Sequence, residues 1–287
     1  RFTALLSGLC GAVNRVGFYS FYNEGLYRGE LLTHRVAYNP HIHIAKNFVA
    51  LVNSLLATEE ELPYSKQVVS DAEVALPVMG YHETEQANMH EMVRRHYPRY
   101  ERGRHRLVLI NPNASELLPQ RRWLPERFVA LMQRILAADQ EVLVLITGAP
   151  TEHDEAAAMR GKVGSDRCLN FAGALQLGQL PVLYTIAALM VTNDSGPGHF
   201  SSITALPTFV LFGPETPGLY GSLGNSTPIF AGLACSPCVS AANHRKTVCR
   251  DNKCLQAITV EQVFAAIGPT LLAGGREDQE SGIGETR

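Results

Sequence analysis

The sequence has no hydrophobic run long enough to cross a membrane and no large excess of charge of one sign. No stretch of its 287 residues approaches the roughly 18 to 20 apolar residues that a membrane-spanning helix needs, and no charged-then-apolar signal segment opens the chain. The formal charge is −2, from 25 basic and 27 acidic residues, so no overall field recruits nucleic acid or an anionic membrane. We therefore expect a cytoplasmic protein that binds no nucleic acid.

The composition also lacks the bias of a disordered or fibrous protein. Hydrophobic residues make up 46% of the chain and charged residues 18%, which excludes a disordered chain, a coiled coil and a collagen-like fibre. The length suits one large or two ordinary α/β domains, each with a buried core. A soluble globular protein is the class that remains.

Cysteine is too sparse for a secreted disulfide scaffold, but its distribution is uneven. Of the six cysteines, Cys235, Cys238, Cys249 and Cys254 fall in one short segment with the spacing C-x2-C-x10-C-x4-C. Four thiolates at such spacing can close a tetrahedral site, and Zn²⁺ or iron suits these soft ligands. Because four protein ligands leave no open position, the predicted metal is structural. The alternative is a reduced loop without metal.

The first third of the chain reads as an incomplete α/β domain. Residues 2–10 look like a helix already in progress, with neither an initiating Met nor a cap before them, which predicts a fragment without its true N-terminus. A short strand follows at 13–18 and a helix at 41–56. Residues 94–106 are rich in arginine and typical of an exposed connection, so we place a domain boundary near 103.

After the boundary, apolar strands alternate with amphipathic helices. This pattern predicts a parallel sheet covered on both faces, in a domain that spans residues 104–273. The tail at 274–287, rich in Gly, Glu and Ser, is predicted to be disordered. The expected strands are 107–110, 142–147, 168–171, 189–192 and 208–212, and the expected helices are 124–138, 151–162, 177–188, 198–205 and one that begins with a capping box at Thr259 and Gln262.

Ligands of such sheets bind at the carboxyl ends of the strands, which makes the loop at 192–199 a candidate site. Its glycines, Gly196 and Gly198, permit close approach of a ligand to the backbone, and Ser195 can cap the following helix. Asp194 can accept hydrogen bonds from sugar hydroxyls, and His199 can donate to a phosphate. A simple capped turn is the alternative. A serine-hydrolase elbow fits poorly because Asn193 stands where that motif requires glycine.

Two further loops leave neighbouring strands. Asn113 and Ser115 lie in the polar turn Asn-Pro-Asn-Ala-Ser after the first of them, and Arg121 and Arg122 follow just before a helix. Arginine forks match phosphate oxygens, so this loop suits a diphosphate, although one or both arginines can equally be solvated. Glu152, after the next strand, can accept from ribose hydroxyls or simply favour the helix dipole.

Taken in order, these motifs resemble glycosyltransferase family 9, the ADP-heptose:lipopolysaccharide heptosyltransferases and their relatives. The resemblance rests on the Asn-Pro-Asn-Ala-Ser turn with Arg-Trp at 122–123, on the loop 193–199, and on the segments Leu-Phe-Gly-Pro-Glu-Thr at 211–216 and Cys-Ser-Pro-Cys at 235–238. It extends over about residues 1–268 and is strongest over 107–254. Some relatives with a similar cysteine segment hold a cysteine-bound iron.

The resemblance implies a GT-B-type fold, in which two Rossmann-like domains face a cleft, with the acceptor in the N-terminal domain and the nucleotide sugar in the C-terminal one. It implies metal-independent transfer that inverts the anomeric centre. By position it assigns donor binding to Ser115 near the phosphates, to Arg121 or its rival Arg122 on the diphosphate, to Glu152 on the nucleoside, and to Asp194, Ser195, Gly196 and His199 on the sugar and diphosphate.

The sequence departs from the family in two places. The family's catalytic aspartate belongs to an early N-terminal stretch that we do not find, so no catalytic residue is assigned and the chain as given is expected to bind donor without necessarily turning it over. Gly198 also replaces a larger residue, such as methionine, that relatives often carry.

The leading functional hypothesis is therefore a glycosyltransferase that moves a sugar, with heptose from ADP-heptose favoured, to a lipopolysaccharide core or related glycan, at the inner face of the membrane. Two alternatives stay open. One is a non-catalytic nucleotide- or glycan-binding module with a structural metal, and the other is a nucleotide-sugar epimerase of similar fold. Peripheral membrane contact through the arginine-rich segment is a further hypothesis.

Overall fold

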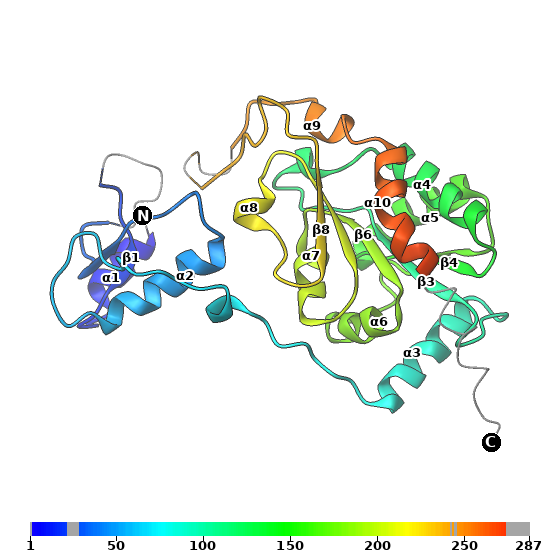
Figure 1. Cartoon of the computed structure of the whole chain (residues 1–287), viewed down its shortest axis with the longest axis horizontal. Coiled ribbons are helices and arrows are strands. Elements are labelled where there is room, and N and C mark those ends of the chain that lie inside the picture. The colour runs from blue at the N-terminus through cyan, green and yellow to red at the C-terminus, as the bar shows by residue number, and fades with distance from the viewer. Residues whose placement is uncertain (1, 22–28, 242, 244–245, 274–287) are drawn as a thin grey trace, which may run out of the picture. The chain divides into compact units, whose positions relative to one another are not determined.

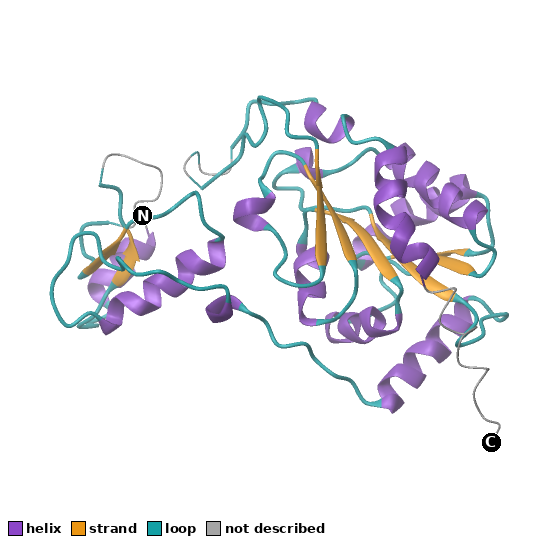
Figure 2. Ribbon diagram, in the orientation of Figure 1, coloured by secondary structure: helices purple, strands orange, loops and turns teal. Residues whose placement is uncertain are grey.

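The computed structural model describes residues 2–21, 29–241, 243 and 246–273, and the chain forms two compact units (Figures 1 and 2). The N-terminal unit comprises residues 1–75, 214–221 and 234–249, and the sheet unit comprises 76–213, 222–233 and 250–287. The predicted disordered tail lies outside the described residues. Within the described part of the chain, no helix combines the length and the apolar character needed to span a bilayer.

The N-terminal unit holds a two-stranded parallel sheet. The strands are β1 (Val16–Phe18) and β2 (His34–Val36), and the helices are α1 (Phe2–Leu9), α2 (Ile44–Asn53) and α8 (Pro217–Tyr220), with 3₁₀ turns at Ser54–Leu56 and Ala72–Val74. The predicted helix near 41–56 is confirmed. Two side chains of its predicted apolar stripe are nevertheless exposed, Phe48 by 55% and Val52 by 64%, because so small a sheet covers little of the helix.

His43 fixes the start of α2. Its Nδ1 accepts a hydrogen bond from the Ala45 N–H at 3.2 Å, so the proton of the neutral ring lies on Nε2. That nitrogen donates to the carbonyl oxygen of Gly221 at 2.8 Å. The ring therefore caps α2 and ties it to the segment that contains α8.

The sheet unit is built on six parallel strands in the order β5-β4-β3-β6-β7-β8. Its apolar central strands are buried along their length, as expected for a sheet covered by helices on both faces. The strands are β3 (Arg106–Asn111), β4 (Val142–Ile146), β5 (Cys168–Asn170), β6 (Leu189–Asn193), β7 (Thr208–Phe212) and β8 (Ser226–Phe230). The α-helices are α3 (Glu83–His96), α4 (Pro125–Ala138), α5 (His153–Val163), α6 (Leu180–Ile186), α7 (Gly196–Phe200), α9 (Lys253–Gln256) and α10 (Val260–Ala273).

Each face of the sheet has its own core. One core joins the sheet to α4, α5 and α10, and its largest member is Trp123. The other joins the opposite face to α3 and α6. Trp123 is the single tryptophan of the chain, is almost fully buried, and donates from Nε1 to the Ile258 carbonyl at 3.0 Å, so its fluorescence reports on this unit.

The regular α/β part of the sequence prediction is confirmed. The capping box of α10 forms as expected, with Thr259 N–H donating to Gln262 Oε1 at 2.8 Å and Gln262 N–H donating to Thr259 Oγ1 at 3.2 Å. The helix predicted at 177–188 begins as a 3₁₀ turn, and that predicted at 198–205 begins two residues earlier and closes with a 3₁₀ turn at Ser201–Ile203. The sequence analysis missed β8, an exposed edge strand interrupted by Pro228.

The arginine-rich segment near 94–106 is part of the packed sheet unit. Tyr97 and Tyr100 are buried in the core on the α3 side, so α3 and the turn after it lie against the sheet. Most of the arginines are paired with carboxylates, among them Arg99 with Asp166. The compact units consequently divide after residue 75, whereas the sequence pattern suggested a boundary near 103.

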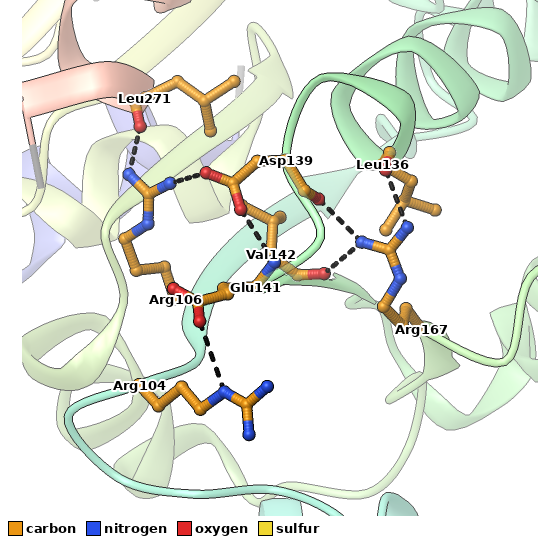
Figure 3. Close-up of polar contacts among 8 residues, drawn as sticks. All are labelled: Arg104, Arg106, Leu136, Asp139, Glu141, Val142, Arg167 and Leu271. Carbon is orange, nitrogen blue, oxygen red and sulfur yellow. Dashed lines mark hydrogen bonds and ion pairs between the residues drawn. The ribbon is translucent and has the colours of Figure 1, made fainter. Parts of the chain in front are cut away.

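Arginines also close the edge of the sheet unit where β3 and β4 begin (Figure 3). Arg106 binds the Asp139 carboxylate and the Leu271 carbonyl, which joins β3 to the end of α10. Arg167 donates to three carbonyl oxygens, those of Leu136 (2.7 Å), Asp139 (2.7 Å) and Val142 (3.1 Å). The bonds to Leu136 and Asp139 satisfy carbonyls at the end of α4 that have no partner within the helix, and the bond to Val142 ties them to the start of β4.

Replacing Arg167 tests this network. Arg167→Ala leaves three carbonyls without their charged donor, and hydrogen bonds to charged groups each contribute about 1.5 to 3 kcal/mol. Because Arg167 is only partly buried and water can replace part of these bonds, we expect a total loss of about 2 to 4 kcal/mol in the free energy of unfolding, followed by Trp123 fluorescence in urea. Arg95→Ala removes a long 3.9 Å surface ion pair with Glu91 and should cost less than about 0.5 kcal/mol. Equal losses in both variants would contradict the role given to Arg167.

The packing of α3 should depend on pH through His90. Burial, together with nearby Arg102 and Arg94, lowers the pKa of His90 below its usual 6.5, and its Nδ1 lies 2.7 Å from the Tyr100 hydroxyl oxygen. Because the unfolded chain then binds the proton more readily, stability is full above the unfolded pKa and falls as the pH drops below it. We expect urea midpoints to decrease from pH 7 to pH 5, with a shallower decrease in His90→Gln.

Candidate functional site

A cavity of about 570 Å³ lies at the carboxyl ends of β3, β4 and β6 in the sheet unit. In parallel α/β sheets this edge is where ligands bind. The residues that line it come from the loops after these strands and from the segment between β5 and α6. They are Asn111, Asn113, Ala114, Ser115, Glu116, Arg122, Thr147, Gly148, Ala149, Pro150, Thr151, Glu152, Glu155, Phe171, Leu175, Leu177, Leu180, Tyr184, Ser195, Gly196 and Pro197.

Buried amide side chains hold the loops at the cavity in fixed positions relative to the strand ends. Asn111 Nδ2 donates to the Thr147 carbonyl at 3.1 Å, which fixes the end of β3 against the end of β4. Asn193, at the end of β6, accepts from the Trp123 N–H at 3.0 Å and donates to the Pro112 carbonyl at 2.7 Å. One fully buried side chain thus joins β6 to both ends of the β3–α4 loop.

The two arginines of this loop have different places. Arg122 lines the cavity, and its Nη2 and Nε donate to the Ala114 carbonyl at 2.9 and 3.2 Å. Arg121 does not line the cavity and instead lies beside Asp194, with its Nη1 3.8 Å from Oδ2. Asn113 and Ser115 line the cavity as the sequence suggested.

Asp194 is a buried carboxylate in the loop after β6, with 2% of its side chain exposed, and neither it nor His199 lines the cavity. Its Oδ1 lies 3.5 Å from His199 Nε2 and its Oδ2 faces Arg121, but neither oxygen has a hydrogen-bond donor among the described residues. A buried carboxylate without donors is costly unless a ligand supplies them. The arrangement therefore has capacity for donors such as hydroxyl groups.

The remainder of the loop after β6 reaches the cavity through Ser195 and Gly196. The Ser195 hydroxyl lies 3.2 Å from Thr192 Oγ1. Gly198 is buried beneath the loop, where an added Cβ would lie 3.1 Å from Thr192 Cγ2 and 3.4 Å from Val210 Cγ2. This position is too tight for a larger side chain without movement, which gives Gly198 a packing role.

Glu152 lies on the opposite wall, in the loop after β4. Its Oε2 accepts from the Ala149 N–H at 2.6 Å, and the other oxygen remains available to a ligand. An added Cβ at Gly148 would lie 2.8 Å from that Oε2 and 3.0 Å from Asn113 Nδ2, so the glycine makes room for both polar side chains. Glu152 can therefore both favour the helix dipole and offer an oxygen to a ligand, the two possibilities that the sequence left open.

The sequence analysis missed the apolar half of the cavity. Phe171, Leu177, Leu180 and Tyr184 line it, on elements predicted correctly but assigned no functional role. Burial raises the pKa of Tyr184, so its phenol stays protonated at neutral pH. Leu177 is largely exposed at the start of a 3₁₀ turn, which the sequence does not reveal. The cavity thus combines a charged end with an apolar end.

The predicted four-cysteine metal site is not supported. No group of three or more His, Cys, Asp or Glu side chains suited to a metal occurs among the residues the structure describes. Cys235, Cys238 and Cys249 belong to the N-terminal unit, whereas Cys254 belongs to the sheet unit. Cys254 is buried on α9, where its Sγ would lie 3.3 Å from a Cβ added at Gly213, so packing accounts for its position.

Asn193 offers a direct test of how the site is assembled. Asn193→Ala leaves the Trp123 N–H and the Pro112 carbonyl buried without partners, at a cost of about 1 to 3 kcal/mol each. We expect the free energy of unfolding to fall by about 3 kcal/mol, measured by tryptophan fluorescence in urea. Asn225→Ala, which removes one exposed bond to the Ala205 carbonyl, should change it by less than about 1 kcal/mol. An Asn193→Ala protein of wild-type stability would refute the assignment.

Solved structures with the same arrangement of elements come from bacterial transferases. The structure of E. coli ADP-heptose lps heptosyltransferase II matches 95% of this chain and 74% of its own, with a TM-score of 0.63 and 18% identity. The glycosyl transferase family 9 structure from Veillonella parvula DSM 2008 matches 94% of this chain and 71% of its own, with a TM-score of 0.64 and 18% identity. At these identities the likeness establishes the α/β fold with a parallel sheet, as in GT-B heptosyltransferase structures.

Comparison of sequences leads to the same group of proteins as comparison of folds. Lipopolysaccharide heptosyltransferase 2 of Escherichia coli (strain K12) and that of Salmonella typhimurium (strain LT2) are each 27% identical over 106 residues, which is 36% of this chain and 30% of each relative's length. The matched region is thus less than a third of each of these relatives. Residues 3–248 match the model of glycosyltransferase family 9 (heptosyltransferase), and the chain belongs to that family.

Proposed function

We propose that this protein is a glycosyltransferase whose sheet unit binds a nucleotide-sugar donor in the cavity at the ends of β3, β4 and β6. The observation that carries the proposal is the division of this cavity into a polar end and an apolar end. A nucleoside diphosphate has the same division, because its diphosphate is anionic and its base is flat and largely apolar. The favoured donor is ADP-heptose.

Arg122 is the proposed diphosphate ligand. It lines the cavity, and its guanidinium uses Nε and Nη2 for one carbonyl, that of Ala114, so Nη1 and the second proton of Nη2 remain for phosphate oxygens. Asn113, Ser115 and the backbone at Ser195 and Gly196 surround the same end. Arg121 is proposed to add positive charge from behind Asp194 without touching the nucleotide.

Glu152 is the proposed ribose ligand, since its carboxylate lines the wall between the polar and the apolar end. The base would lie among Phe171, Leu177 and Leu180, with the protonated Tyr184 hydroxyl as a hydrogen-bond donor. Four apolar or aromatic side chains on one wall provide stacking area but few polar groups, so discrimination between bases would rest on a small number of contacts.

Asp194 and His199 are the proposed ligands of the sugar. The two donor-free carboxylate oxygens of Asp194 would accept from sugar hydroxyls, which removes the cost of leaving them unpaired. His199 is half-exposed and contacts Asp194, so it is suited to contact both the sugar and the phosphate next to it. Gly198 supports this loop from below.

The proposed reaction is a direct displacement that inverts the anomeric centre and needs no metal. A base, which we do not assign to a residue, would deprotonate an acceptor hydroxyl, and that oxygen would attack the anomeric carbon as the bond to the diphosphate breaks. Arg122 would stabilise the negative charge that develops on the departing nucleotide.

The proposed acceptor is a lipopolysaccharide core or a related lipid-linked glycan. A soluble donor with a lipid-linked acceptor places the reaction in the cytoplasm at the inner face of a membrane.

The arginine-rich segment 94–106 contributes little to the proposed membrane contact. Its charges are largely compensated, as in Arg94 with Glu91 at 3.0 Å and Arg104 with Glu141 at 3.2 Å. Exposed ion pairs leave only a weak net field for lipid head groups. Contact with a membrane would therefore arise mainly from binding the acceptor.

Nucleotide binding separates the proposed roles. We expect ADP to bind more tightly than UDP or GDP in calorimetric titration. Arg122→Gln should weaken the binding of ADP at least about 10-fold but the binding of adenosine by less than about 2-fold, because the proposed contacts of this arginine are to phosphates alone. Glu152→Gln should weaken the binding of ADP and the binding of adenosine by a similar factor, because both contain the ribose. Arg134→Gln, a surface arginine on α4, is the matched control and should change neither.

Product analysis tests the reaction itself. Incubation with ADP-heptose and a lipopolysaccharide acceptor that lacks the heptose should give an acceptor heavier by one heptose, with equimolar ADP, and Asp194→Asn should slow transfer by about 100-fold. An isomerised nucleotide sugar would instead identify an epimerase. ADP binding with no product would favour the non-catalytic binding module.

A further inference from the structure

A second cavity, of about 330 Å³, lies at the free edge of the parallel sheet and is separate from the donor cavity. The edge strand is β5, which pairs on one side with β4. The helices beside the cavity come from opposite faces of the sheet, α3 from one core and α5 from the other (Figure 1). The residues that line it are His96, His153, Ala157, Arg160, Leu169 and Asn170.

Arg160 is held against the edge strand by its own hydrogen bond. Its Nε donates to the outward carbonyl of Cys168 at 3.0 Å, which satisfies an acceptor that a missing strand would otherwise bind. Within the described residues its two terminal nitrogens make no hydrogen bond or ion pair. A fixed guanidinium with free terminal donors at a cavity is suited to bind an oxyanion.

The two histidines have matching hydrogen-bond arrangements. His96 Nδ1 lies 3.0 Å from the Met92 carbonyl oxygen, and His153 Nδ1 lies 3.2 Å from Asp154 Oδ1. Both partners are acceptors, so each Nδ1 carries a proton and donates it, which leaves Nε2 to the ligand. When the ring carries its second proton, Nε2 becomes a second donor.

The charge around this cavity is predominantly basic. Arg160, His96 and His153 are the charged or titratable residues that line it, and no carboxylate does. Asp154 is fully exposed and acts through His153. Asn170 is already committed, because its Nδ2 donates to the His153 carbonyl and its Oδ1 accepts from the Ala172 N–H, both at 3.0 Å. Among the side chains that line this cavity, the hydrogen-bond donors without a partner therefore outnumber the acceptors without one.

We propose that this cavity, the edge-strand cavity, binds a small solute that carries a phosphate-class oxyanion, held by Arg160 and by Nε2 of His96 and His153, which donates when the ring carries its second proton. Its volume suits a single phosphoryl group with a small organic part and is well below that of the donor cavity. The proposal stands independently of the proposed transferase activity.

The edge-strand cavity also shares a wall with the donor cavity. The His96 ring lies 4.4 Å from the Phe171 ring, measured between centroids, and Phe171 lines the donor cavity. Asn170, which lines the edge-strand cavity, immediately precedes Phe171 in the chain. An anion that fixes His96 therefore restricts the aromatic wall against which a nucleoside would pack.

Histidine NMR tests the proposal on the whole chain. Protein with ¹³C-labelled histidine would be titrated with inorganic phosphate at constant pH, and the signals of His96 and His153 would be identified by their loss in His96→Gln and His153→Gln. We expect these two signals to move along one saturable curve.

A matched pair of variants on α5 makes the test specific. Arg160→Gln should weaken phosphate binding at least about 10-fold, while Lys162→Gln, which removes the same charge two residues further along the helix, should change it by less than about 2-fold. The remaining histidine signals show that each variant is folded, and the His199 signal reports separately on phosphate at the donor loop. Unsaturable or unequal shifts of His96 and His153, or equal affinity in Arg160→Gln, would overturn the proposal.

Discussion

The site of this protein depends on one buried amide, that of Asn193. It stands at the end of β6 and satisfies the Trp123 N–H and the Pro112 carbonyl, at the two ends of the loop that leaves β3. Parallel strands bring their loops to a common edge, but they do not fix the height or angle of each loop. The amide does so here, since neither partner has another way to be satisfied in a dry core. The cavity wall formed by Asn113, Ser115 and Arg122 is positioned as a consequence.

The electrostatics of the site follow from that frame. Asp194, the next residue, is drawn into the interior beside Arg121 and His199, while Arg122 is directed to the cavity through its bonds to Ala114. Two adjacent arginines thereby acquire different surroundings, one beside a buried carboxylate and the other facing the cavity.

Much of this was predictable from the sequence, because the evidence for a parallel α/β unit is local. Apolar runs such as 142–146 and the capping box at Thr259 and Gln262 depend on few residues and short distances. The different places of Arg121 and Arg122 were not predictable, since they depend on Ala114 and Asp194, which come together with the arginines only in the folded chain. The four-cysteine metal site predicted from spacing is not supported among the described residues, where Cys254 is buried. The apolar wall at Phe171 and Tyr184 was hidden because core and ligand-facing aromatics have the same pattern in sequence.

The central claim is that a nucleoside diphosphate binds at the carboxyl ends of β3, β4 and β6. Amide hydrogen exchange with and without ADP tests it most directly, because it locates the ligand without any assumption about the reaction. The account predicts slower exchange in three separate loops, at 113–116, 148–152 and 195–197, with little change in the exposed edge strand β8. Protection confined to the N-terminal unit, or no protection at saturating ADP, would contradict it.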